Sequence, residues 1–228
     1  MIKKINKLVK VTVIAAIFAI TVNSVLWAEY TLLSSTDPVV RMREAQRLGN
    51  ELDRESLPQL IALLEDNSSG VRLHAAVSLG RIGDRSALPA LLNALNSDQS
   101  AAVRIMTAQA LGGFREKKAV EALVEAVAEG DENTRPAAIR ALGRSGGEEV
   151  LDILVEKAKD HESSRVRVAA LDSLAEMLIS GAPDDGDTVR IERALTEAAD
   201  EGEPTVKNAA LRGLRRVEET RERGELLR

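Results

Sequence analysis

Cysteine is absent from the 228-residue chain, and aromatic residues make up only 2% of it. Without cysteine the protein can form no disulfide, thiolate nucleophile, cysteine-ligated zinc or iron site, or lipid-modified cysteine of the bacterial lipoprotein kind. The two histidines, His74 and His161, are too few for a histidine-rich metal site. The chain is nevertheless 44% hydrophobic and 29% charged, which predicts a folded protein.

Acidic residues are also missing from the first 28 positions, where an uncharged, mostly aliphatic run over residues 11–28 follows a basic stretch. The basic residues are Lys3, Lys4, Lys7 and Lys10. A basic segment followed by an apolar segment is typical of an export signal. We expect cleavage after Ala28 or Ser24. The alternative is an uncleaved membrane anchor, because the run approaches the roughly 20 residues that span a bilayer. Either way, the rest of the chain is predicted to lie outside the cytoplasm, as a periplasmic, secreted or anchored protein.

Removal of residues 1–28 takes away four basic residues and no acid. The balance becomes 27 basic against 36 acidic residues (31 − 4 against 36), a net charge of −9. Tyr30 and Phe114 are then the aromatic residues left. A net acidic chain with so few aromatic side chains is unsuited to phosphate-backbone binding and base stacking, so we expect no nucleic-acid partner.

A segment of about 31 residues recurs along the chain. VRMREAQRLGNELDRESLPQLIALL, from Val40, matches VRLHAAVSLGRIGDRSALPALLNAL, from Val71, without a gap. Later copies begin at Val103, Thr134, Val166 and Val206. One leucine recurs at Leu48, Leu79, Leu111, Leu142, Leu174 and Leu214, followed in four copies by Gly49, Gly80, Gly112 and Gly143. Such self-similarity is the signature of a repeat protein.

Each copy carries apolar residues at helical spacing in two blocks, which predicts two antiparallel amphipathic helices joined by a turn such as Gly83-Asp84. One such pair cannot bury its apolar stripe alone, so neighbouring copies must stack into a solenoid. We expect a linker at residues 29–36 and a repeat domain at 37–228. Its copies begin near 37, 68, 100, 132, 163 and 204, with about eight extra residues near 180–188.

The second copy resembles the HEAT repeat of the short phycobilisome-lyase type, whose pattern runs V-R-x-x-A-A-x-x-L-G-x-I-G-D-x-x-A-L-P-x-L. This resemblance implies an all-α fold, a right-handed α-α superhelix of about 5.5 repeats of 31–32 residues. Two copies depart from the pattern, with Ala175 and Arg215 in place of the glycine. The first copy has Glu44 where others have Ala or Thr, as expected of an outer helix without a neighbour.

Candidate catalytic features are few. Deoxyhypusine hydroxylase, built from similar repeats, holds a di-iron site with several His-Glu pairs, whereas this chain has one, His161-Glu162, which we interpret as a loop. Phycobilisome lyases attach bilins in the cytoplasm, a role that export disfavours. Asp184, Asp185 and Asp187 could gather around Ca²⁺, but their spacing lacks the acid ladder of an EF-hand, and a solvated turn is favoured. We therefore expect no metal, no cofactor and no catalytic residue.

A basic residue recurs at the second position of every first helix. The six residues are Arg41, Arg72, Arg104, Arg135, Arg167 and Lys207. A phosphate-binding ladder is one interpretation. Acidic residues recur in the turns as well, either Asp53, Asp84, Glu116 and Glu148 or Asp66, Asp98, Asp131 and Asp160. We favour a structural ladder of arginine-carboxylate bonds that ties neighbouring repeats together.

The resemblance implies that the second helices line the concave side of the superhelix. On a helical wheel their exposed positions are neutral or apolar near the N-terminus and acidic near the C-terminus. The expected partner-binding residues are Gln59, Ala62, Ala90, Asn93, Glu121, Glu125, Asp152, Glu156, Glu192 and Glu197. We also expect Leu63 to belong to this surface and Ala94 to flank it.

These observations favour an exported, non-catalytic scaffold or adaptor that binds a protein or peptide with apolar and basic character on its second helices. Two alternatives remain open: a metal- or ligand-dependent enzyme of the HEAT-like lyase or hydroxylase kind, and a membrane-anchored structural component of the cell envelope.

Overall fold

The computed structural model describes residues 33–181 and 184–226, with side chains as far as residue 223. The predicted export segment or anchor lies outside these residues. Within the described part of the chain no helix is long and apolar enough to cross a membrane, and no strand is present.

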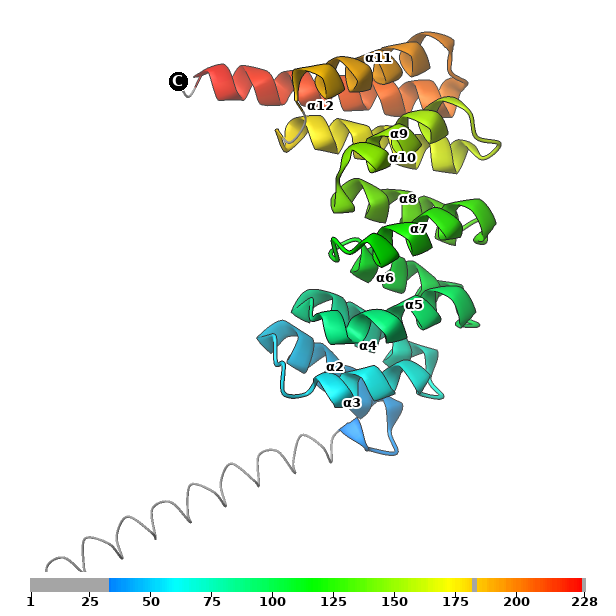
Figure 1. Ribbon diagram of the computed structural model, residues 1–228, viewed down its shortest axis with the longest axis vertical. Coiled ribbons are helices and arrows are strands. Elements are labelled where there is room, and N and C mark those ends of the chain that lie inside the picture. Colours follow the sequence, from blue (N-terminus) through cyan, green and yellow to red (C-terminus); the bar gives the residue numbers. More distant parts are fainter. Residues whose placement is uncertain (1–32, 182–183, 227–228) are drawn as a thin grey trace, which may run out of the picture.

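Helices alternate along the chain between two layers (Figure 1). The first helices of the repeats are α2 (Pro38–Glu51), α4 (Ser69–Ile82), α6 (Ala101–Leu111), α8 (Thr134–Ser145), α10 (Ser164–Ile179) and α12 (Pro204–Leu226). The second helices are α3 (Leu57–Ala62), extended by the 3₁₀ turn η1 (Leu63–Glu65), α5 (Leu88–Ser97), preceded by η2 (Arg85–Ala87), α7 (Lys117–Glu129), α9 (Glu148–Lys159) and α11 (Asp185–Glu201). Each first helix packs on the next one, which produces the elongated stack.

The recurring leucine forms the centre of the core in every complete repeat. Leu48, Leu79, Leu111, Leu142 and Leu174 are all fully buried. Leu214 is half-buried, because α12 has no following helix pair among the described residues. Burial is therefore supplied by neighbours along the stack, as in other solenoids.

The recurring glycine marks the closest approach of neighbouring first helices. A Cβ atom on Gly80 would lie 2.5 Å from the Cβ of Ala110, and one on Gly143 would lie 2.7 Å from the Cβ of Ser173. Gly49 and Gly112 face the next repeat in the same way. Protein interiors leave no room for such an added methyl group, so the glycine is required by packing between repeats.

The turn inside the second repeat has the conformation that Gly83 and Asp84 predict. Gly83 adopts a left-handed conformation (φ 64°) at the end of α4, and the Asp84 carboxylate accepts a hydrogen bond from the Ser86 amide. In the first repeat the equivalent position is Leu52, which takes the same conformation (φ 55°). A left-handed leucine costs about 1–2 kcal/mol, since its Cβ crowds the following carbonyl group.

The extra residues of the fifth repeat lengthen its helices as well as its turn. α10 has 16 residues and α11 has 17, longer than in the preceding repeats. Asp184 caps α11 by accepting a hydrogen bond from the Asp187 amide at 2.8 Å. The expectation for Glu44 was wrong: this side chain is buried and paired with Arg47 at 2.7 Å.

Candidate functional site

Arginines at the start of the first helices bind carboxylates of the turn that leads into the next repeat. Arg41 Nε lies 2.7 Å from Asp66 Oδ2, and Arg72 Nε lies 2.7 Å from Asp98 Oδ2. In both pairs Nη2 donates a second hydrogen bond to the other carboxylate oxygen. Such bidentate bonds fix distance and orientation together. These arginines therefore set the spacing between repeats.

The same guanidinium groups also reach the turn before their own helix. Arg72 Nη1 donates to the Asp66 carbonyl oxygen at 2.8 Å, and Arg104 Nη1 donates to the Asp98 carbonyl oxygen. Burial alone would raise the pKa of Asp98. The hydrogen bonds from Arg72 and the Ser100 amide outweigh burial, and the pKa of Asp98 is lowered. The carboxylate is thus stabilised in its charged form.

Toward the C-terminus the pattern continues with different acids. Arg104 pairs with Asp131 at 3.0 Å. Arg135 pairs with Glu162 at 2.9 Å, rather than with Asp160, and Arg167 pairs with Glu203 at 2.8 Å. Lys207, the last of the six basic residues, is exposed and has no ion-pair partner in the described part of the chain, so the series of ion pairs ends at Arg167.

Three of the candidate metal ligands, His161, Glu162 and Asp187, have other partners. His161 Nδ1 accepts a hydrogen bond from the Ser163 amide at 3.0 Å, while Glu162 binds Arg135. Asp187 pairs with Arg190 at 3.3 Å. Within residues 33–181 and 184–223, no three His, Asp or Glu side chains are grouped so as to hold an ion.

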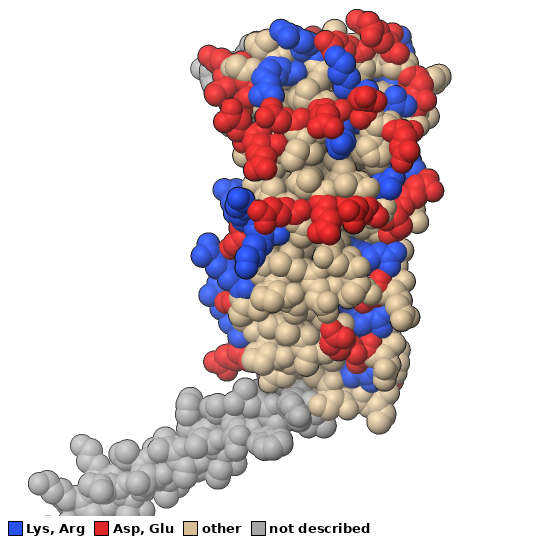
Figure 2. Space-filling model, turned by 45° about the vertical axis from the view of Figure 1, so that its right-hand side comes forward, with Lys and Arg blue, Asp and Glu red and all other residues tan. Residues whose placement is uncertain are grey.

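The residues expected to bind a partner lie on the second helices, and most of them are accessible. Ala62, Asn93, Glu121, Glu125, Asp152, Glu156 and Glu197 are exposed, and Gln59, Ala90 and Glu192 are half-buried. Leu63 and Ala94 are buried, so their placement beside the surface was wrong. Figure 2 shows a largely neutral surface at the level of α3 and α5, broken by one small group of acidic side chains, and a band of acidic side chains at the level of α7.

Most of the expected acids are paired. Asp152 binds Arg190, Glu156 binds Lys157, Glu192 binds Arg221 and Glu197 binds Lys159. On α7 the situation differs. Glu121 lies 3.6 Å from Lys117, but Glu125 and Glu129 have no ion-pair partner in the described part of the chain. Among the six expected acids, Glu125 is therefore the one without an ion-pair partner in the described residues.

A column of aliphatic side chains runs beside these residues and was missed by the helical wheel. Ile61, Leu92, Val124 and Val155 occupy equivalent positions in four repeats and are half-buried. Each directly follows a fully buried leucine of the second helix. This recurring pair of apolar residues is the feature of the sequence from which the column could have been predicted. The column offers apolar contact along the face of the stack.

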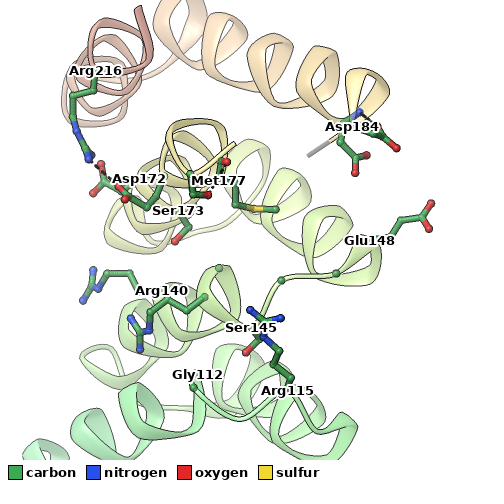
Figure 3. A pocket seen from close by; sticks show the side chains of 18 of the residues that line it. Gly112, Arg115, Arg140, Ser145, Glu148, Asp172, Ser173, Met177, Asp184 and Arg216 are labelled. Atoms are coloured by element: carbon green, nitrogen blue, oxygen red, sulfur yellow. Dashed lines mark hydrogen bonds and ion pairs between the residues drawn. The ribbon is translucent and has the colours of Figure 1, made fainter. Parts of the chain in front are cut away.

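A cleft of about 1310 Å³ lies elsewhere, at the C-terminal ends of α8 and α10 and beside α12 (Figure 3). None of the ten expected partner-binding residues lines it. Six of its charged side chains come from equivalent positions of consecutive first helices. Those side chains are Arg140 and Arg144 on α8, Asp172 and Glu176 on α10, and Arg212 and Arg216 on α12. Sequence reasoning missed the cleft because the charge at these positions changes sign between repeats.

The HEAT repeats family model matches residues 29–101 and 88–175, which together make up more than half of the chain. With the stacked helix pairs, this match shows that the chain belongs to the HEAT-repeat family, and the expected all-α superhelical fold is confirmed.

Among solved structures the chain is similar to the complex of CpcE and CpcF of phycocyanin lyase from Nostoc sp. PCC7120. The identity is 26%, the alignment covers 82% of this chain and 85% of that chain, and the TM-score is 0.54. YibA of Escherichia coli is 20% identical over 84% and 71% of the two chains, with a TM-score of 0.56. An archaeal HEAT-like repeats protein from Thermococcus onnurineus NA1 is 20% identical over 83% and 78%, with a TM-score of 0.51. A comparison with curated protein sequences found no match.

Proposed function

We propose that this HEAT-repeat protein is an exported, non-catalytic scaffold that binds a protein partner on the surface of its second helices. The observation that supports this proposal is the change of surface between α5 and α7. Neutral side chains and the aliphatic column cover most of α3 and α5. A row of glutamates lies on α7, and two of them, Glu125 and Glu129, have no ion-pair partner among the described residues. Repeat stacks present long surfaces of this kind to extended or helical partners.

The partner is a segment with an apolar end and a basic end. Glu121, Glu125 and Glu129 are four residues apart, so they share one face of α7 and form a row along it. Lysine or arginine side chains of the partner would pair with this row. The apolar end would contact Leu92 and Ala90, which are half-buried and lie next to solvent. Charge would then govern the association rate, and apolar contact would slow dissociation.

Two further features support the proposal. Residues 1–28 have the order of a basic and then an apolar segment that export signals share. The structural neighbour from Nostoc is a complex of two chains, so a surface of this fold is compatible with protein association.

The test uses the partner recovered by crosslinking in cells and then purified, with the dissociation constant measured at low and at high salt. Glu125→Lys should weaken binding roughly three- to tenfold at low salt and less at high salt, because exposed charges are screened. Ala90→Arg should weaken binding at both salt concentrations, since the long side chain covers the apolar surface.

Two matched controls make the same changes of charge and size away from the second helices. Glu218→Lys makes the same charge change at an exposed position of α12, and Ala102→Arg makes the same size change on the exposed side of α6. Neither should alter the dissociation constant. If the controls weaken binding as much as the test variants, the second helices are not the binding surface.

A further inference from the structure

The charged groups of the cleft beside α8, α10 and α12 are incompletely paired. Arg216 binds Glu176 at 2.8 Å, and Arg144 Nη2 donates to the Gln109 carbonyl oxygen at 2.9 Å. Within the described residues, Arg115, Arg140 and Arg212 have neither an ion pair nor a hydrogen bond. Three guanidinium groups that line one cleft are therefore available to a ligand.

The acids of the cleft do not cancel this charge where the arginines lie. Figure 3 shows Arg140 on one side of α10 and Arg216 on the other, with Asp172 between them, whereas Glu148 and Asp184 lie at the opposite end of the view. Asp184 caps α11 and Asp187 binds Arg190. Asp172 is the carboxylate left among the arginines, and Arg140, Arg212 and Arg216 all act on it electrostatically.

The arginines of the cleft are placed so that they repel one another. Arg140 and Arg144 are four residues apart on α8, as are Arg212 and Arg216 on α12, and like charges at that spacing repel. Burial, followed by the charge of Arg140, lowers the pKa of Arg144, and burial raises the pKa of Asp172. Titratable groups with perturbed pKa values that line a cleft are candidates for a binding site.

We propose that this cleft binds an acidic segment of a protein partner, whose carboxylates pair with Arg140 and Arg212. The shape favours a chain over a small ion. The cleft is larger than the usual 300–1,000 Å³ of small-molecule pockets. Gly146 and Gly147 leave its rim open, because no atom lies within 4 Å of a Cβ built on either residue. The site is separate from the second-helix surface and takes a ligand of the opposite charge.

The test uses the full chain and a short capped fluorescent peptide of alternating glutamate and glycine, with a glutamine-glycine peptide as the neutral control. Fluorescence anisotropy should show binding of the glutamate peptide alone. Arg140→Gln and Arg212→Gln should each weaken it about tenfold, the effect of one charge-assisted hydrogen bond. Arg43→Gln, at an exposed arginine of α2 without an ion-pair partner in the described part of the chain, should leave the dissociation constant unchanged.

Two further variants keep the result unambiguous. Asp172→Asn should tighten binding, because it removes the opposing charge, and a gain cannot come from a damaged fold. Glu125→Lys should have no effect, which separates this site from the proposed function. Binding that survives both arginine substitutions, an absence of binding, or displacement of the peptide by an equal concentration of inorganic phosphate would overturn the proposal.

Discussion

Gly80→Ala tests whether close approach of the first helices holds the repeats together. The new Cβ would lie 2.5 Å from the Cβ and 2.8 Å from the Cα of Ala110, so the backbone of α6 would have to move. Overpacking of this kind costs about 1–3 kcal/mol. Alanine is also the better helix former, by about 1 kcal/mol. The net expectation is a free energy of unfolding that is lower by about 0–2 kcal/mol, and not higher.

Gly70→Ala is the matched control, because Gly70 lies in the same helix and its Cβ would meet no atom closer than the Met42 sulfur at 3.6 Å. This variant keeps the helix-forming gain without the clash and should be neutral or stabilising. Urea unfolding followed by circular dichroism measures both, with the m-values compared to check cooperativity. The packing argument fails if Gly80→Ala is stabilised as much as Gly70→Ala.

Other variants test the remaining features. Leu111→Ala, at a fully buried position, should cost roughly 2–5 kcal/mol of unfolding free energy, and Leu214→Ala, at a half-buried one, much less; equal losses would mean that the C-terminal helix is covered. Arg72 lowers the pKa of Asp98 below its unfolded value of 3.8. The stabilisation of the folded protein by this pair should therefore be complete above pH 3.8 and disappear as the pH falls through the folded pKa. Asp98→Asn should make the free energy of unfolding less dependent on pH in this acid range. Burial raises the pKa of Asp172, so its charged form destabilises the folded protein, unlike that of Asp98. Asp172→Asn should therefore not destabilise the protein at neutral pH, and a clearly lower free energy of unfolding would contradict the partly desolvated charge. A reporter active only after export, fused after Arg228, should be active, and cytoplasmic residence would refute export.

The repeat structure could be predicted because the same residues recur at a fixed spacing along the sequence. The leucine and glycine columns, such as Leu111 and Gly112, recur at fixed intervals, and each interval corresponds to one contact between neighbouring helices. The helix pairs follow from that periodicity alone.

Pairing across repeats was only partly predictable. Every repeat offers acids in two turns, and spacing does not show which turn lies beside the arginine. In the structure the arginines bind the turn between repeats, as in the pairs with Asp66 and Asp98. In the fourth such turn Arg135 binds Glu162 and not the expected aspartate.

The cleft could not be recognised from the sequence. Arg140, Asp172 and Arg212 occupy one repeat position, yet their charges alternate, and about eight extra residues separate the last two copies. A column is visible in a sequence when its members are alike, whereas this site depends on unlike neighbours that come together only when the repeats stack.

Site-specific photo-crosslinking in cells tests the proposed binding surface most directly. A photoreactive amino acid would replace Asn93 on α5 or Glu125 on α7, and Gln46, exposed on α2, would serve as the control. Mass spectrometry would then map the crosslinked peptide. We expect the two second-helix positions to crosslink to the apolar and basic parts of one segment of one protein, with no such product from Gln46. Crosslinks from Gln46 to that same segment, with none from Asn93 and Glu125, would contradict the assignment of the binding surface to the second helices.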